Sequence, residues 1–126
     1  METRRYSGLG DIDVNDFRRI WNECIIPSLK DNPDLRNARG GKYIIDKVDE
    51  NQITRFATSN KRKRSVSFQE CQKVYNALIE NGEYISSNDV RNTVELWCAA
   101  FIISLLDILP HVKATNKPRG LELIFE

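Results

Sequence analysis

Histidine and cysteine, the residues that most often bind metals and act as nucleophiles, are scarce in this sequence. Its 126 residues include one histidine, His111, and three cysteines that lie far apart, Cys24, Cys71 and Cys98. A structural zinc site needs four ligands, usually in closely spaced pairs, so we predict neither a metal nor a cofactor. The cysteines fall within apolar helical patterns, and we expect them to be buried thiols in a reducing compartment.

Recognisable catalytic motifs are also missing. The chain has no glycine-rich phosphate-binding loop, no G-x-S-x-G turn and no H-E-x-x-H zinc motif. A metal-dependent nuclease of the common type would need a D/E-x-K triplet to hold the metal and activate the nucleophile, and no such triplet occurs. We expect His111, which follows Pro110 in a tail strand, to be a surface histidine without a catalytic partner. The sequence therefore predicts a protein that is not an enzyme.

Long apolar runs and a signal peptide are absent as well. The most apolar run extends from Leu96 to Leu109, and Ser104 and Asp107 interrupt it. It is shorter than the roughly 20 residues that a membrane-spanning helix needs. The N-terminal sequence METRRYSGLG lacks the apolar core of a signal peptide. We expect a cytoplasmic protein, or a nuclear one if the host is eukaryotic.

Charge of one sign is concentrated in the middle of the chain. The net charge is only +1. Residues 39–64 carry eight basic and three acidic side chains, which is +5, so the remainder carries −4. Such an uneven distribution favours an anionic partner for the middle segment.

Apolar periodicity and turn residues predict five elements. We expect a helix over 13–30, capped by Asp13 and kinked or ended at Pro27, followed by a polar loop over 31–41. Short β-prone runs predict a hairpin over 42–58, with an additional extended piece near Ser65. The remaining elements are a helix that opens with an S-x-x-E capping box, a buried central helix over 88–109, and a C-terminal hairpin over 111–125.

This order predicts one α+β domain over 1–126, in which the N-terminal helix precedes an α/β module over 41–126. We expect a small antiparallel sheet, built from both hairpins and packed against three helices. A winged-helix arrangement is also compatible with a short helix, a longer apolar helix and a final hairpin.

The basic run Lys61–Arg64 permits three interpretations. It forms a solvated loop, a patch that contacts phosphates, or, in a eukaryotic host, a nuclear import signal. Of the two nearby aromatic residues, we expect Phe68 in the core, so Phe56 alone gives only slight support for base stacking. The candidate nucleic-acid-binding residues are Lys42, Arg55, Lys61, Arg62, Lys63 and Arg64.

About two thirds of the chain resembles a small α/β accessory module of prokaryotic restriction-type endonucleases and related defence proteins. The first hairpin, the helix after it and the "LP" at the end of the apolar helix carry the resemblance. Tyr75 stands where a tryptophan is usual, and the first helix is not part of the pattern. The resemblance implies DNA binding beside a separate catalytic domain. The matching positions are Gly41, Tyr43, Ile45, Ile53, Arg55, Val66, Ser67, Tyr75, Leu78, Leu109 and Pro110.

Two functions remain open at this point. The first is a non-catalytic module that binds nucleic acid, with DNA favoured, through the first hairpin and the basic run. The second is a protein-interaction or regulatory subunit of a phage or defence system, with a nuclease or another subunit as its partner. An acidic N-terminal helix beside a basic hairpin would suit that role.

Overall fold

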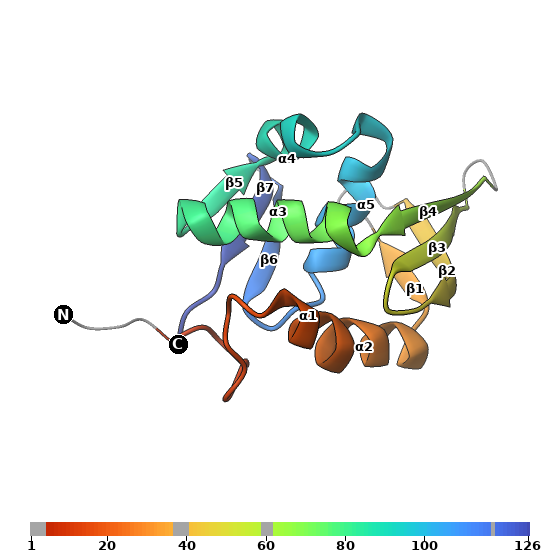
Figure 1. The fold of residues 1–126 in the computed structure, drawn as a ribbon. Coiled ribbons are helices and arrows are strands. Elements are labelled where there is room, and N and C mark those ends of the chain that lie inside the picture. Colours follow the sequence, from red (N-terminus) through yellow and green to blue (C-terminus); the bar gives the residue numbers. More distant parts are fainter. Residues whose placement is uncertain (1–4, 37–40, 59–61, 117) are drawn as a thin grey trace.

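Two antiparallel sheets lie at opposite ends of the long helix α3 (Phe68–Asn81). Figure 1 shows the ribbon of this computed structural model, which describes residues 5–36, 41–58, 62–116 and 118–126. The strand that enters α3 belongs to one sheet, and the strand that leaves it belongs to the other. The predicted α+β class is confirmed.

The first sheet has four strands in sequential order, β1-β2-β3-β4. The hairpin predicted over 42–58 is confirmed, and the extended piece near Ser65 is the fourth strand. The first strand falls within the predicted loop over 31–41, where it pairs with β2, so that part of the prediction was wrong. The strands are β1 (Asp34–Arg36), β2 (Lys42–Val48), β3 (Gln52–Ala57) and β4 (Lys63–Ser67).

The second sheet has three strands in the order β5-β7-β6. Its hairpin confirms the one predicted over 111–125, and the short β5 adds to the outer side of β7. The two predicted hairpins therefore lie in separate sheets, not in one. Each hairpin can be predicted from residues that are close together in the sequence. Whether the two hairpins join one sheet depends on residues on both sides of α3, which are far apart in the sequence. The strands are β5 (Tyr84–Ser86), β6 (Val112–Asn116) and β7 (Arg119–Leu123).

The N-terminal helix consists of α1 (Phe17–Ile20), a π-helical turn η1 (Trp21–Ile25) and α2 (Ile26–Asp31). It starts later than predicted because the side chain of Asp16, not that of Asp13, accepts the capping hydrogen bond, from the Arg19 N–H. The chain stays helical through Pro27, so the helix does not end there, which was one of the two predicted outcomes. The π-helical turn η1 ends two residues before Pro27. Proline has no backbone N–H, so a regular α-helix would lack one hydrogen bond at this point.

Helix α3 begins with the predicted capping box. The Ser67 hydroxyl accepts from the backbone N–H of Glu70, and the Glu70 carboxylate accepts from the backbone N–H of Ser67. Gly82 ends the helix in the left-handed conformation, with a φ of 90°. Because both ends depend on local residues, the sequence predicts this helix well.

The central helix predicted over 88–109 is two helices, α4 (Ser87–Thr93) and α5 (Leu96–Leu106). The Thr93 hydroxyl donates to the carbonyl of Asp89, and Val94 and Glu95 then adopt extended conformations. Helix α5 is buried, as predicted. Its core side chains include Cys98, Phe101, Ile102, Leu105 and Leu106.

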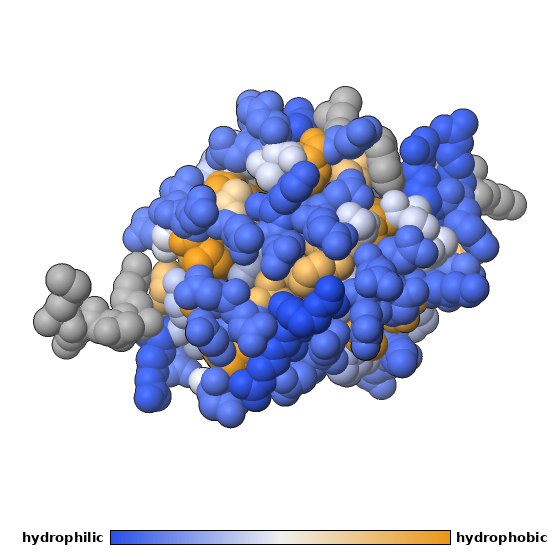
Figure 2. Space-filling view, in the orientation of Figure 1, coloured by the Kyte–Doolittle hydropathy of each residue, from blue (hydrophilic) through white to orange (hydrophobic). Residues whose placement is uncertain are grey.

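Aromatic rings join the N-terminal helix to α3. The Phe17 ring lies 4.7 Å from that of Tyr75 and 5.3 Å from that of Phe68, between ring centroids. On the face shown in Figure 2, hydrophobic atoms appear only in small patches among hydrophilic side chains. None of the helices in the described part of the chain has the length and apolar character needed to cross a membrane.

Candidate nucleic-acid interface

The outer face of the four-stranded sheet brings aromatic, aliphatic and basic side chains together. Strand alternation turns Tyr43 and Ile45 of β2 into the core, so Ile44 between them points outward and is 37% exposed. Across the sheet, Ile44 pairs with Phe56 of β3, and Phe56 pairs with Lys63 of β4. Cross-strand partners share a face, so these three side chains form one row.

A shallow apolar hollow lies on this row. It has a volume of about 330 Å³, and its lining is dominated by Ile44 and Phe56, with Ala57 and Thr58 at the end of β3. Contiguous apolar surface rimmed by polar residues marks interaction sites in soluble proteins, and this pair is a candidate for one. Sequence reasoning missed this surface, because it gave Phe56 little weight and did not consider Ile44. Alternation within each strand was the available signal.

Lys63 of this row and Lys42 beside it each form an ion pair with a carboxylate. The Nζ atom of Lys42 lies 3.0 Å from Asp34, and that of Lys63 lies 3.1 Å from Asp46. The Nζ atom of Lys63 is also 5.3 Å from the centroid of the Phe56 ring. All four charged side chains are substantially exposed, and such ion pairs contribute about 0–1 kcal/mol. A phosphate can therefore replace these carboxylates at small cost.

A β-bulge shapes the same face. The register between β2 and β3 shifts between Ile45 and Lys47, so Asp46 and Lys47 are both exposed although they are consecutive. Asp46 lies on the outer face, as Ile44 does, and contacts Lys63 two strands away. Strict alternation would turn Lys47 into the core, so the sequence gives no simple sign that Lys47 is exposed.

Arg55, one of the predicted phosphate-binding residues, lies on the inner face of the sheet. The residue is only 4% exposed, and its guanidinium carbon lies 5.1 Å from the Tyr43 ring centroid and 5.3 Å from that of Phe101. Burial lowers the pKa of Arg55 from its ordinary value, and the positive charge of Arg64 lowers it further. A guanidinium stays protonated all the same. Arg55 is therefore a core residue, and its assignment to a phosphate-binding surface was wrong.

The basic run is divided between a strand and the residues before it. Lys63 and Arg64 belong to β4, so the prediction of an exposed loop over Lys61–Arg64 was wrong for these two. Lys63 is exposed on the outer face, whereas Arg64 pairs with Arg55 and is half-buried. Arg62 is exposed just before β4, and Lys61 lies outside the described residues. Strand alternation thus separates side chains that the sequence places in one cluster.

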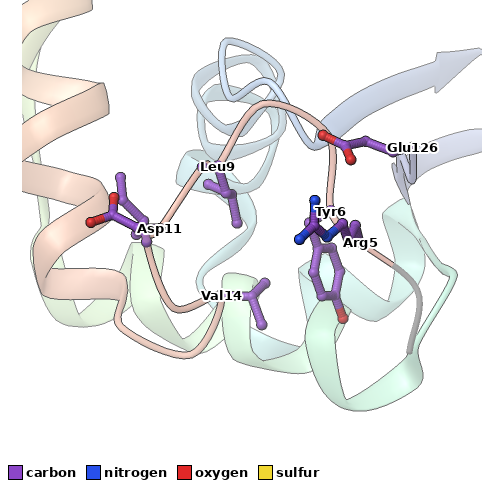
Figure 3. Close-up of a pocket in the computed structure, with 8 residues that line it drawn as sticks. Arg5, Tyr6, Leu9, Asp11, Val14 and Glu126 are labelled. Atoms are coloured by element: carbon purple, nitrogen blue, oxygen red, sulfur yellow. The ribbon is translucent and has the colours of Figure 1, made fainter. Parts of the chain in front are cut away.

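A second hollow lies where the two ends of the chain meet, with a volume of about 590 Å³. Figure 3 shows Arg5 and Tyr6 beside Glu126, with Leu9 and Val14 along the loop that follows. Tyr6 forms a bridge with Phe125, and the Glu126 N–H donates to the Arg5 carbonyl. The lining mixes charges of both signs and has no evident selectivity for one class of ligand.

His111 is fully buried near this hollow and is not the surface residue that we predicted. The Tyr75 hydroxyl donates to the Val14 carbonyl at 2.7 Å, so it accepts from Nε2 of His111 at 2.8 Å. Nδ1 of His111 is buried and has no hydrogen-bond partner within the described part of the chain. Burial lowers the pKa of His111 to about 4, so its ring is neutral at pH 7.

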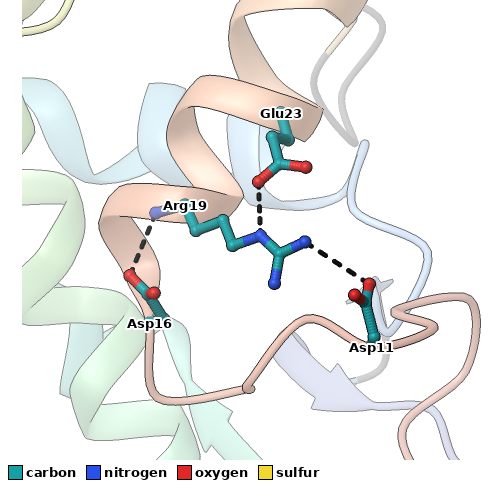
Figure 4. Close-up of polar contacts among 4 residues, drawn as sticks. All are labelled: Asp11, Asp16, Arg19 and Glu23. Atoms are coloured by element: carbon teal, nitrogen blue, oxygen red, sulfur yellow. Dashed lines mark hydrogen bonds and ion pairs between the residues drawn. The ribbon is translucent and has the colours of Figure 1, made fainter.

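The acidic residues around the N-terminal helix are held by an arginine. Figure 4 shows Arg19 between the carboxylates of Glu23 and Asp11, while its backbone N–H donates to Asp16. The hydrogen bond to Glu23 is the main cause of the raised pKa of Arg19. Within the described residues, no three side chains of histidine, cysteine, aspartate or glutamate gather as a metal site would require.

Comparisons of this chain with protein-family models, with curated proteins and with solved structures found no match.

Proposed function

We propose that this protein is a non-catalytic nucleic-acid-binding module whose outer sheet face contacts the phosphate backbone. The observation that carries the proposal is the row of Ile44, Phe56 and Lys63, which joins apolar surface to positive charge. Lys42 extends the charge at one side of the row and Arg62 at the other. Nucleic-acid-binding surfaces combine these two properties, because phosphates need cations and base faces need apolar or aromatic partners.

The charge on and beside this face is positive. It includes five cations and two carboxylates, and the turn that follows β2 adds the exposed acids Asp49 and Glu50. Both carboxylates are the exposed partners of Lys42 and Lys63, which leaves them open to replacement by phosphate. The five cations are Arg36, Lys42, Lys47, Arg62 and Lys63, and the carboxylates are Asp34 and Asp46.

We also propose that residues 68–123 form a winged-helix unit that serves as a scaffold. The order α3, β5, α4, α5, β6, β7 and the sheet order β5-β7-β6 support this. In helix-turn-helix proteins, the second helix of the pair reads the major groove. Here that helix is α5, which is buried and contacts the four-stranded sheet through Phe101 and Tyr43. The proposed binding surface is therefore the sheet and not α5.

Two of the side chains suited to catalysis, His111 and Cys98, support a binding role. His111 is fully buried, and burial raises the pKa of Cys98 to about 12, so neither provides an accessible reactive group at neutral pH. The free thiols are consistent with a cytoplasmic location, or a nuclear one in a eukaryotic host. A catalytic partner, such as a nuclease of a defence system, belongs to the same proposal and would match the resemblance noted in the sequence.

The exposed hollow at Ile44 and Phe56 also favours a second function, the binding of a protein partner as a regulatory subunit. An apolar patch ringed by polar residues is typical of protein interfaces. This function predicts an affinity for a partner protein that depends on Ile44 and Phe56 and only slightly on salt.

Fluorescence anisotropy with labelled single-stranded and duplex oligonucleotides tests the proposed function. We expect binding at about 50 mM salt. The logarithm of the association constant should fall linearly with the logarithm of the salt concentration, because lysine and arginine side chains that bind phosphates release counterions from the nucleic acid. The double variant Arg62→Ser, Lys63→Ser should reduce the magnitude of the slope by about 1.4–1.8, since each lost phosphate contact contributes about 0.7–0.9.

The matched control is Lys73→Ser, Lys113→Ser, which removes two exposed lysines from α3 and β6. We expect this pair to change the slope much less than the pair on the sheet. Failure of the wild-type protein to bind either oligonucleotide at 50 mM salt would refute the proposed function. Equal losses in the two double variants would show that the contact is a general charge effect and not a property of the sheet.

A further inference from the structure

We infer that the outer sheet face binds single-stranded nucleic acid, with an unpaired base stacked on the ring of Phe56. This inference rests on the proposed function and adds the class of ligand. It starts from the position of the ring, which is half-buried on β3 between Ile44 and Lys63. Its cross-strand neighbours on β2 and β4 lie on both sides of it, so the ring is placed within the sheet face and not at its edge.

The shape of the site selects unpaired bases. The hollow on Ile44 and Phe56 is shallow and lies on the surface of a sheet. Base faces in a duplex are covered by the neighbouring base pairs and cannot reach such a surface. In a single strand the bases can turn outward and stack on an aromatic side chain. A sheet face with a half-buried aromatic ring therefore suits a single strand better than a duplex.

The cations lie where the backbone of such a strand would pass. Lys63 is the cross-strand neighbour of Phe56, and its Nζ atom is 5.3 Å from the ring centroid. Its flexible stem can swing away from the ring toward a phosphate, leaving the ring free for a base. Lys42 lies two residues from Ile44 on the same face of β2, so it provides a second cation on the opposite side of the hollow.

A second copy of this chain is a poorer occupant of the face. Two identical faces would bring together two surfaces that are rich in lysine and arginine, and like charges across an interface oppose association. The apolar part is also small, because Ile44 is the one large hydrophobic side chain that is exposed among those whose burial the structure describes. An anionic ligand with flat apolar faces satisfies both parts of the surface.

The test measures the affinity of the full chain for a labelled single strand and a duplex of the same sequence. We expect the wild-type protein to bind the single strand more tightly. Phe56→Leu keeps an apolar side chain but removes the ring, and should weaken single-strand binding about 5- to 100-fold without changing the salt dependence. Phe56→Trp should retain binding. Phe125→Leu, a ring at the chain terminus, is the control and should leave the affinity unchanged.

A gain-of-binding variant guards against effects of misfolding. Asp46→Asn removes the carboxylate that competes for Lys63, and should tighten single-strand binding by up to about five-fold. Loss of folding cannot produce such a gain. On irradiation, an oligonucleotide that contains 5-iodouridine should cross-link to residues of β3. The variant Phe56→Leu should abolish this cross-link.

The results separate this inference from the proposed function. Binding of the duplex as tightly as the single strand, with no effect of Phe56→Leu, would overturn the inference but leave the proposed function standing. Absence of binding to both would overturn both. Self-association that Phe56→Leu abolishes, without nucleic-acid binding, would assign the face to a second copy and refute the inference.

Discussion

Protonation of His111 should control the stability of this fold between pH 5 and 7. His111 is fully buried, and its Nδ1 atom has no hydrogen-bond partner among the described residues. Since Nε2 already donates to Tyr75, a second proton would have to go to Nδ1. That proton would place an uncompensated charge in the core. This cost is the reason that burial lowers the pKa of His111 to about 4.

The sign of the effect follows from the two pKa values. The unfolded chain has a histidine pKa of about 6.5, and the folded chain has a lower one. Between these values the unfolded state binds more protons, so the free energy of unfolding falls as the pH falls. The stability is fully present above pH 6.5 and is lost progressively toward pH 4. A decrease from pH 7 to pH 5 should cost about 2 kcal/mol.

Urea unfolding at pH 7.0 and at pH 5.0 measures this loss through the fluorescence of buried Trp21, whose Nε1 donates to the Asp49 carbonyl at 2.9 Å. His111 is the chain's only histidine, and histidine is the side chain whose ordinary pKa lies in this interval, so the interval reports mainly on one side chain. The variant His111→Phe fills a similar volume and leaves the Tyr75 hydroxyl bonded to Val14. We expect it to reduce the pH-dependent loss to under about 0.5 kcal/mol. The same loss in the variant and the wild-type protein, or a folded-state His111 pKa near 6.5 by NMR, would refute the reasoning.

Two further substitutions test parts of the fold that the sequence did not predict. Arg55→Ala should lower stability by about 2 kcal/mol, because it removes a buried stem from between Tyr43 and Phe101, while the nucleic-acid affinity of the folded protein stays the same. Arg36→Ala, at an exposed position, should lower the nucleic-acid affinity and leave the stability unchanged. If both variants lose affinity equally, Arg55 belongs to the binding surface after all. Gly120→Ala should cost about 2–3 kcal/mol in thermal or urea unfolding, since its new Cβ would lie 2.2 Å from the Ile85 carbonyl oxygen and force β5 away from β7. Gly10→Ala, which has open space but a φ of 60°, should cost only about 1 kcal/mol, and equal costs would contradict the close contact at Gly120.

The elements that the sequence predicted well are those defined by neighbouring residues. Ser67 and Glu70 lie three positions apart and cap α3 through their own side chains and backbone. The strands of the first hairpin follow from β-branched and aromatic residues on each side of a polar turn. In both cases the deciding interactions form within a few residues, so a single sequence contains the necessary signal.

The errors arose where distant residues decide the structure. Asp16, and not Asp13, caps the first helix, whose Phe17 packs against Phe68 of α3. Likewise, β1 forms within the predicted loop because it pairs with β2, which lies further along the chain. Arg55 was placed outside because charged side chains are rarely buried. Its position two residues after Ile53, a core residue of the same strand, was the local sign of an inward side chain.

The two faces of the four-stranded sheet differ in role, since the inner face packs in the core and the outer face is the proposed binding surface. The inner face must cover α5, whose apolar side chains need a second layer, and Tyr43, Arg55 and Val66 are committed to it. The outer face carries no such requirement, so its composition is free to serve a ligand. A solvated sheet face that served only solubility would carry polar residues at the positions of Ile44 and Phe56. As cross-strand neighbours the apolar pair stabilises the sheet, but a polar pair would serve solubility better, and this is the physical reason to look for function on that face.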